Sequence, residues 1–377
     1  MQTNLGLADD ASVVQRILDH IDRKTTDLGD ETWREPVANY RSPARFAAEI
    51  DQVLRRNPAA FCPSAALPEA GSWVARDSAG TPLLAVRGSD GRVRAFRNAC
   101  RHRGMQLAAG AGCARSFVCP YHGWTYGLDG SLRHVPAEHG FPGLDKATHG
   151  LAPVAAREQQ GIVFVTQDAA PGADEALASL PPLIPASYRL QGASERDVPA
   201  NWKIVVEGFL EGYHIRSTHP STFYPIQYDN LNVVERFGRN NRVAFPYQAV
   251  EKLRGVAPEA RHADGKLTYV YHLFPSSIVA TFPGRIVLVA LEALALDRTR
   301  FVTYVLSDRD PSDAPAGERL KRGGDLVDLG AAEDREIVCA IQRSLASGAN
   351  QHFEFGRFEA AIVHFHRTLR EALGEAA

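Results

Sequence analysis

Apolar residues near the start of the chain recur at helical spacing in two stretches. Residues 8–25 carry them every three or four positions, behind two aspartates that could cap a helix. Residues 42–55 repeat this pattern behind a Ser-Pro pair, which favours a helix start. We expect two helices here that serve only to pack against the rest of the protein.

The pattern then changes to short apolar runs separated by tight turns. Residues 73–75, 83–86 and 93–96 form such runs, with aspartate and glycine in the turns between them, and residues 161–165 form the last one. This spacing is typical of antiparallel hairpins. The region therefore predicts a small antiparallel β domain.

A second, larger region follows residues 168–185, which are rich in Ala, Pro and Gly and predict a linker. It has a helical motif at 201–219 and two helical patterns near its end, at 331–345 and 358–373. Between them lie β-branched and aromatic runs that predict a meandering antiparallel sheet, at 267–271, 277–281, 286–291 and 300–306. The fold class is α+β, divided into N-terminal helices at 1–45, a β domain at 46–166 and a larger domain at 167–377.

Composition excludes several classes of protein. The 377 residues suffice for two domains, and a formal net charge of −2 lacks the charge excess of nucleic-acid or membrane binders. Five scattered cysteines form no disulfide framework and fit a reducing cytoplasm. Neither a signal peptide nor an apolar run of membrane-spanning length is present. We expect a cytoplasmic protein whose partners are neither nucleic acid nor membrane.

Candidate metal ligands first appear as a Cys-x-His pair and a Cys-x-x-His pair. Cys100 and His102 form the first pair, and Cys119 and His122 form the second. Two thiolates and two imidazoles suit either tetrahedral zinc or a Rieske [2Fe–2S] cluster, in which two Cys hold one iron and two His the other. One Cys and one His on each loop favour the cluster, because zinc fingers more often take both cysteines from one loop. Structural zinc remains an alternative.

A second metal motif lies in the helical segment at 201–219. Glu211 precedes His214 by three residues, and His219 follows it by five, which suggests part of a 2-His-1-carboxylate iron site. On a regular helix a five-residue step turns roughly 140° away, so both histidines reach one ion only if the helix is broken. Pro220 favours such a break, because the residue before a proline avoids helical conformation.

The third ligand of this site should be a carboxylate from a distant element. Asp334 is the best candidate, placed near the start of the helix predicted at 331–345, with Glu333 and Glu336 as rivals. An acidic pair at a helix start also has a simpler use, because it complements the helix dipole.

The remaining histidines and cysteines suggest packing. His364 and His366 stand two apart on a predicted helix and point to different sides, so they are poor joint ligands. Cys113 lies between the two metal loops and fits neither pair.

These motifs, in this order, resemble the Rieske non-haem iron oxygenases, specifically their catalytic alpha subunit. The flanks strengthen the resemblance: His-Arg-Gly in the first loop and Pro-Tyr-His-Gly-Trp in the second are similar to the two Rieske loops. The resemblance runs from about residue 45 to the C-terminal helix. It implies a Rieske domain and a catalytic domain of helix-grip (START-like) fold, in which an antiparallel sheet wraps a long helix.

The resemblance also implies roles for the candidate residues. The two Cys-His pairs would hold the cluster, and His214, His219 and Asp334 would hold Fe(II). Glu211 stands where the family has a carboxylate between the two centres, so it would link His214 to His122 of a neighbouring subunit in a head-to-tail homotrimer. Many members of the family have aspartate at this position, and the glutamate of this chain is similar to the branch that acts on quaternary ammonium compounds.

We therefore expect a terminal oxygenase that uses O₂ to hydroxylate, dihydroxylate or oxidatively demethylate an aromatic or quaternary-ammonium small molecule. Electrons from NAD(P)H would arrive through a ferredoxin or flavin reductase, because the chain has no Gly-x-Gly-x-x-Gly fingerprint. The substrate pocket should be lined by the sheet strands and by residues 223–228. Two alternatives are a Rieske electron carrier with a non-catalytic second domain and a zinc-stabilised START-like ligand-binding module.

Overall fold

The computed structural model describes residues 6–169, 173–309 and 314–375. Its contacts divide the chain into two compact units, one made of Met1–Leu54 with Ser187–Ala377 and the other of Arg55–Ala186. The sequence placed these limits earlier in the chain, at 45/46 and 166/167. The limits differ because the sequence pattern predicts the helix at 42–55 and the linker at 168–185 but does not indicate which unit each of them packs against.

The unit Arg55–Ala186 is built from antiparallel strands, as the hairpin signals predicted. Its seven-stranded sheet has the order β2-β11-β10-β5-β4-β3-β6, and a three-stranded sheet has the order β7-β8-β9. The predicted linker contains a short helix, α4 (Ala173–Ala178), while residues 170–172 lie outside the described residues. The strand bounds are β2 Ala59–Pro63, β3 Ser72–Ser78, β4 Thr81–Arg87, β5 Val93–Arg97, β6 Gly110–Cys113, β7 Phe117–Val118, β8 Thr125–Tyr126, β9 Leu132–His134, β10 Pro153–Gln159 and β11 Ile162–Thr166.

The other unit is organised by a second seven-stranded antiparallel sheet. Its order, β12-β18-β17-β16-β15-β14-β13, follows the chain through β13 to β18, so the predicted meander is confirmed. β12, which comes first in the chain, lies at the edge of the sheet and pairs with the last strand, β18. The strand bounds are β12 Arg189–Val198, β13 Val233–Phe237, β14 Asn240–Pro246, β15 Leu267–Leu273, β16 Ser277–Phe282, β17 Arg285–Ala295 and β18 Arg298–Ser307.

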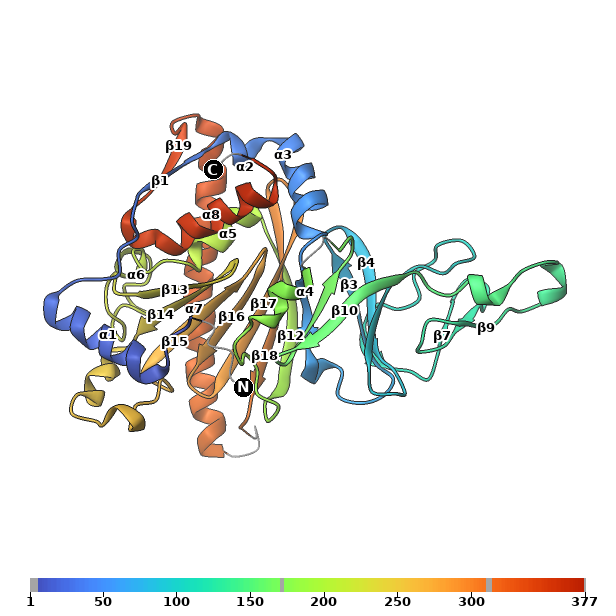
Figure 1. The fold of residues 1–377 in the computed structure, drawn as a ribbon, viewed down its shortest axis with the longest axis horizontal. Helices are drawn as coiled ribbons and strands as arrows, with labels where there is room; N and C mark the ends of the chain where they lie inside the picture. The colour runs from blue at the N-terminus through green and yellow to red at the C-terminus, as the bar shows by residue number, and fades with distance from the viewer. Residues whose placement is uncertain (1–5, 170–172, 310–313, 376–377) are drawn as a thin grey trace. The chain divides into compact units, whose positions relative to one another are not determined.

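Helices cover this sheet. In Figure 1 α7 (Ala314–Ser344) is a long orange helix that runs past the strands, with α5 (Trp202–Gly208) beside its upper half. α6 (Ile215–Thr218) also contacts α7, and α8 (Ala360–Ala372) contacts β13 and β14. The sequence predicted α7 only from residue 331; the glycine pair 323–324, poor in helix propensity, obscures the preceding turns. No helix among the described residues is long and apolar enough to cross a membrane.

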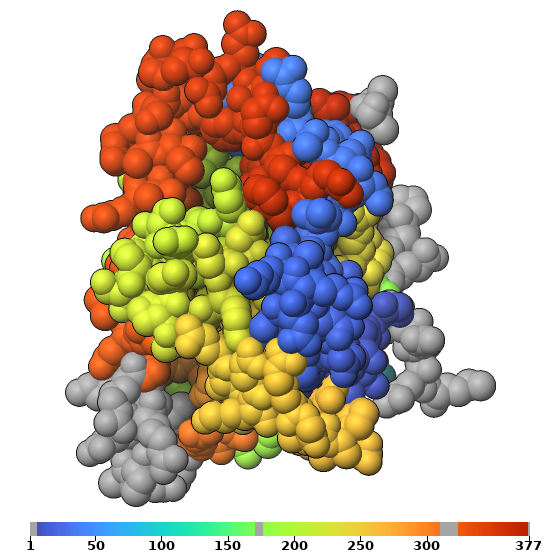
Figure 2. All heavy atoms as spheres, turned by 90° about the vertical axis from the view of Figure 1, so that its left-hand side faces the viewer, coloured from blue at the N-terminus to red at the C-terminus, as the bar shows by residue number. Residues whose placement is uncertain are grey.

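The N-terminal helices join the unit that contains the large meander. α1 (Asp10–Arg23) packs against β13 and against two short turns of helix, Gln248–Leu253 and Pro258–Ala260, and Figure 2 shows it in blue beside that yellow segment. The second predicted helix is confirmed as α3 (Pro43–Ala48), which continues into a π-helical turn, Glu49–Leu54. α2 (Ala38–Arg41) precedes it, and β1 (Trp33–Pro36) pairs with β19 (His352–Phe355).

Candidate functional site

Two loops of the smaller unit carry the Cys-His pairs, and their backbones are hydrogen-bonded alike. In the first, the N–H of Gly104 donates to Cys100 O at 2.8 Å and the N–H of Cys100 donates to Met105 O. The second loop repeats both bonds, from Gly123 to Cys119 O at 2.9 Å and from Cys119 to the carbonyl five residues on. Both glycines have positive φ, which other residues rarely adopt. The sequence thus shapes two matching loops around the two cysteines.

These loops bring the four candidate ligands into one neighbourhood. Both thiols, of Cys100 and Cys119, are 3% exposed, and the rings of His102 and His122 are 4.7 Å apart between centroids. His102 also stacks on Trp124 at 5.0 Å, which fixes its orientation. Two buried thiols beside two more accessible imidazoles are a donor set that fits a Rieske cluster.

Tyr126 is a site residue that the sequence did not single out. Its hydroxyl lies 3.2 Å from Cys100 Sγ and accepts a hydrogen bond from the N–H of Arg101 at 2.9 Å. Burial, and then the neighbouring thiol of Cys100, raise the pKa of Tyr126, so its hydroxyl keeps the proton that it can donate to a thiolate. Such hydrogen bonds to ligand sulfur tune a cluster's reduction potential.

The second candidate centre is built on a broken helix, as the His-His spacing predicted. α5 ends at Gly208, α6 starts only at Ile215, and His219 lies beyond the end of α6 in a non-helical conformation (φ −116°, ψ 43°). Only the four-residue helix α6 separates the two histidines, and His219 leaves the helical conformation just before Pro220, with its ring 5.2 Å from that of His214. A continuous helix would have pointed them to different sides.

His214, His219 and Asp334 form a group of potential metal ligands. One donor atom from each lies within 4.8 Å of the others. Oδ1 of Asp334 is 2.9 Å from Nε2 of His219 and 3.5 Å from Nε2 of His214. Nε2 of His219 is buried, and it has no hydrogen bond of acceptable geometry within the described ranges. A buried nitrogen lone pair beside a carboxylate and a second imidazole fits a divalent metal ion.

Carboxylates hold the other ring nitrogen of each histidine. Nδ1 of His214 contacts Oε1 of Glu211, and Nδ1 of His219 lies 2.7 Å from Oε2 of Glu333. Each Nδ1 is thereby protonated and each Nε2 is left to coordinate an ion. Burial alone would lower the pKa of both histidines, but Glu211 for His214 and Asp334 for His219 outweigh it and raise both.

The three carboxylates considered as third ligand have different places. Asp334 belongs to the group of potential metal ligands with His214 and His219. Glu333 contacts Nδ1 of His219 and also accepts a hydrogen bond from Thr222 Oγ1 at 2.5 Å. Glu336 is exposed. One expectation was wrong: Asp334 lies deep in the 31-residue helix α7, not near a helix start. Glu333 and Asp334 therefore do not complement the helix dipole, because the dipole acts on charges within the first turn of a helix.

A buried polar network lies one helical turn before Glu211. Oε1 of Glu207 accepts from the hydroxyl of Tyr40 at 2.6 Å and lies 2.9 Å from Nε2 of His366. His366 is 1% exposed, which confirms the packing role expected for it. Nearby, burial and then the charges of Glu211 and Glu207 raise the pKa of Glu359 to about 7. No local sequence pattern indicates this network, because its members come from four separate segments.

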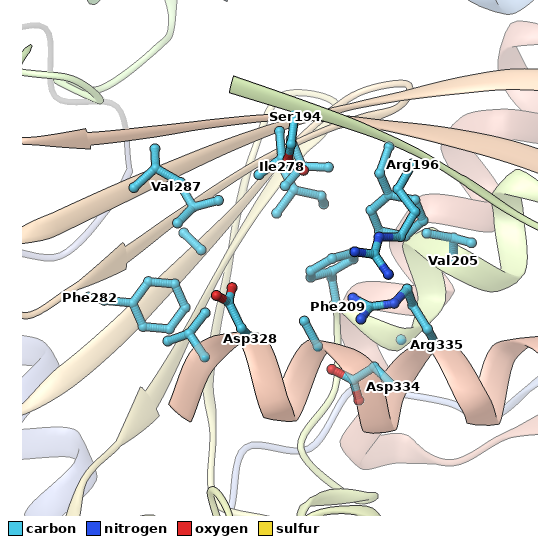
Figure 3. A pocket seen from close by; sticks show the side chains of 18 of the residues that line it. Ser194, Arg196, Val205, Phe209, Ile278, Phe282, Val287, Asp328, Asp334 and Arg335 are labelled. Carbon is cyan, nitrogen blue, oxygen red and sulfur yellow. The ribbon is translucent and has the colours of Figure 1, made fainter. Parts of the chain in front are cut away.

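A cavity of about 410 Å³ adjoins Asp334. Figure 3 shows it between the helices and the sheet, with residues of β12, β16, β17, α5 and α7 around it. Sheet strands line this cavity, and Phe223, Pro225 and Ile226 of the segment expected in the substrate pocket line a separate hollow. Which hollow binds substrate stays a prediction. Phe223 packs on His219, with ring centroids 4.7 Å apart, and so supports the metal centre.

Comparison with known protein families agrees with this geometry. Residues 185–375 match the family described as the ring hydroxylating alpha subunit (catalytic domain), and residues 57–149 match the Rieske [2Fe-2S] domain. The first match covers the unit with the histidines and Asp334, and the second covers both Cys-His loops.

Curated relatives and solved structures point the same way. The carnitine monooxygenase oxygenase subunit of Escherichia coli (strain K12) is 34% identical over 371 residues, covering 90% of this chain and 94% of the relative. The biphenyl 2,3-dioxygenase alpha subunit of Rhodococcus jostii is 32% identical over 210 residues, or 52% of this chain and 46% of the relative.

Two solved structures share the fold at lower identity. A quaternary ammonium Rieske monooxygenase in complex with L-carnitine superposes with a TM-score of 0.75 at 21% identity, over 91% of this chain and 96% of that one. Naphthalene 1,2-dioxygenase from Rhodococcus sp. superposes at 0.77 with 20% identity, over 97% and 99%. Family matches on both units and a relative similar over nearly its whole length show that the chain belongs to the Rieske non-haem iron oxygenases, as a catalytic alpha subunit.

Proposed function

We propose that this terminal oxygenase uses O₂ and electrons from NAD(P)H to hydroxylate or oxidatively demethylate an aromatic or quaternary-ammonium small molecule. The observation that carries the proposal is the convergence of His214, His219 and Asp334 within 4.8 Å beside a cavity of about 410 Å³. The substrate classes are those of similar proteins, which include carnitine and glycine betaine monooxygenases and a biphenyl dioxygenase.

Each candidate residue takes a role in this proposal. Cys100, Cys119, His102 and His122 hold the [2Fe–2S] cluster. His214, His219 and Asp334 would hold Fe(II), and Asp334 also lines the cavity. When bound, the cluster supplies single electrons and the ferrous ion supplies a centre that reacts with O₂.

Glu211 and Glu333 position the imidazoles. Each accepts the Nδ1 proton of one histidine, which keeps that ring in the tautomer whose Nε2 lone pair faces the ion. Oε2 of Glu211 also accepts from the N–H groups of Tyr213 and His214, so its side chain is held by its own loop. The carboxylate is therefore ordered before any partner arrives.

The same carboxylate has a second use in an oligomer. We expect Glu211 to bind His122 of a neighbouring copy, which would connect the two kinds of centre through one hydrogen-bonded side chain in a homotrimer. His122 is exposed in this chain, as such a contact requires. A ferredoxin or flavin reductase in the cytoplasm would deliver the electrons.

The two alternative functions lose support. An electron carrier needs no second metal group, and a zinc-stabilised binding module needs neither Rieske loops nor this carboxylate–histidine arrangement. Neither alternative explains why residues 185–375 match the catalytic domain of the ring hydroxylating alpha subunit.

Metal analysis with a visible spectrum tests the proposal. We expect red-brown protein with about three irons per chain, two in the cluster and one in the catalytic unit. With a surrogate reductase, NADH and a panel of aromatic acids, aryl ethers and quaternary amines, at least one compound should couple O₂ uptake to product. About two irons per chain would indicate a carrier, and colourless zinc protein would refute both iron centres.

A further inference from the structure

The cavity beside Asp334 is lined by one face of the sheet. Alternate residues of β16, β17 and β18 point into it, as the two-residue period of a strand requires, and α5 and α7 close the other side. The strand residues concerned are Ile278, Ala280, Phe282, Val287, Val289, Phe301, Thr303 and Val305. A ligand here would lie against a largely apolar wall.

The aromatic residues of this wall are poorly suited to bind a cation. The aromatic residues among the described lining are Phe209, Phe282 and Phe301, with neither tyrosine nor tryptophan. Tryptophan and tyrosine rings attract an ammonium group most strongly, so a cage for a cation would favour them. The walls suit the apolar body of a ligand better than its charge.

Two arginines supply the charge. Figure 3 shows the side chains of Arg196, from β12, and Arg335, from α7, directed toward each other on one side of the cavity. Neither guanidinium makes a hydrogen bond or an ion pair with the part of the chain that the structure describes. Arg196 is exposed and Arg335 is half-buried, whereas the buried Arg242 of the same unit is paired with Glu235.

The acidic residues of the lining form no ion pair with either arginine in the part of the chain that the structure describes. Asp334 directs Oδ1 to the two histidines, and Figure 3 shows Asp328 nearer Phe282, on the other side of the cavity. A third lining arginine, Arg285, already has an interaction partner. The cavity therefore has an apolar body and one end with two guanidinium groups that have no ion-pair partner among the described residues, and these groups match the planar oxygens of a carboxylate.

We propose that the substrate carries a carboxylate, which Arg196 and Arg335 bind while its apolar body lies along the sheet. The proposal rests on the proposed oxygenase function and narrows its substrate to organic acids, with or without a quaternary ammonium group on the body. It makes the arginines specificity-determining residues, separate from the side chains that hold metal.

Three ligands of matched shape test the charge preference: 3-phenylpropanoate, 3-phenylpropanamide and 3-phenylpropylammonium. Their binding to the anaerobic holoenzyme is measured by calorimetry. The acid should bind at least ~10-fold more tightly than the amide or the ammonium ion, as expected for charge-assisted hydrogen bonds. Equal affinities, a preference for the ammonium ion or no binding of the acid would overturn the proposal.

Two substitutions assign the preference to residues. Arg196→Gln and Arg335→Gln should each weaken binding of the acid by about 10-fold and leave the amide unchanged. Arg196→Lys should retain part of the affinity, because it keeps the charge without the planar fork. Asp328→Asn is the matched control: it alters the same cavity with the opposite charge, and acid binding should hold or strengthen.

The same samples separate this proposal from the function on which it rests. Iron content and the visible spectrum report whether both centres are intact in each variant. Acid binding that survives both arginine substitutions but disappears on removal of iron would mean direct coordination to the metal, and would refute the arginine site alone. Arginine-dependent acid binding by protein whose catalytic unit takes up no iron even when Fe(II) is supplied would refute the oxygenase proposal alone.

Discussion

The two candidate metal sites surround their histidines with opposite charges. In the Rieske loops, burial and then the charges of His122 and Arg103 lower the pKa of His102. In the catalytic unit, Glu211 and Asp334 overcome the effect of burial and raise the pKa values of His214 and His219. One chain thus prepares one imidazole site among cations and the other among carboxylates.

The difference matches what each site must hold. A cluster that accepts an electron gains negative charge, so nearby cations favour its reduced form. A ferrous ion is a dication, so carboxylates around neutral imidazoles favour its binding. The comparison teaches that the two sites can be disturbed separately, and that their responses to charge and pH should differ.

Removing a catalytic ligand should have the largest effect. His219→Ala should lower the iron content from about three to about two per chain while the Rieske spectrum persists, because the two ligand sets share no residue. Turnover should fall more than about 100-fold, beyond the usual loss for an outer partner. Metal analysis and absorption spectra check this, and loss of the cluster signal would show that the sites depend on each other.

A smaller effect is expected when only the outer carboxylate changes. Glu333→Gln keeps the size of the side chain but weakens its hold on Nδ1 of His219, and should lower affinity for catalytic iron about 10- to 100-fold. Glu336→Gln is the matched control, since Glu336 is an exposed acid on the same helix. Titration of iron into metal-free catalytic sites measures both. Equal losses in the two variants would point to general surface charge.

Acidification should separate the sites without any mutation. Because the pKa values of His214 and His219 are raised, falling pH should weaken the binding of catalytic iron sooner than it would with unshifted histidines; the lowered pKa of His102 delays competition at the cluster. In iron-free protein, the protonated forms of His214 and His219 stabilise the fold, and this stabilisation is fully present below pH ~6.5. It is lost as the pH rises through the raised pKa values of the two histidines. Iron retention followed from pH 8 to 5 should show catalytic iron leaving first; the reverse order would break the comparison.

The smallest expected effect concerns the potential of the cluster. Arg103 is exposed and packs on Tyr121, with its guanidinium 5.2 Å from the ring centroid. Arg103→Gln removes a cation that favours the reduced cluster and should lower its reduction potential by roughly 20 mV, the Coulomb effect of one charge ~10 Å away in water. Arg92→Gln, in a distant hairpin turn of the same unit, controls for net charge. A rise in potential would contradict the electrostatic account.

The sequence predicted best what is local in the chain. The Cys-His loops, the hairpins around them and the end of the helical turn at His219 all depend on glycines, prolines and spacings within a few residues. The outer roles of Glu333 and Tyr126 were missed, because each depends on which atom of a distant side chain faces it. The residue type of Asp334 identified it as a candidate ligand, but the sequence pattern did not predict that it lies in the middle of α7.

The substrate cavity lay beyond sequence reasoning for the same reason. Arg196 is on an edge strand and Arg335 on a helix, and only the pairing of β12 with β18 brings the strand to the cavity. Each arginine alone resembles an ordinary surface residue. Their shared direction and their lack of a partner in the described structure are visible only in three dimensions.

The central claim is that the two sites are distinct and that Glu211 connects them. Its most direct test is a single turnover, in which wild-type and Glu211→Gln protein with reduced clusters are mixed with O₂ and a substrate, and cluster oxidation is followed by absorbance. We predict unchanged cluster and iron content in the variant, with cluster oxidation slowed by at least about 10- to 100-fold. Oxidation at the wild-type rate would contradict the claim.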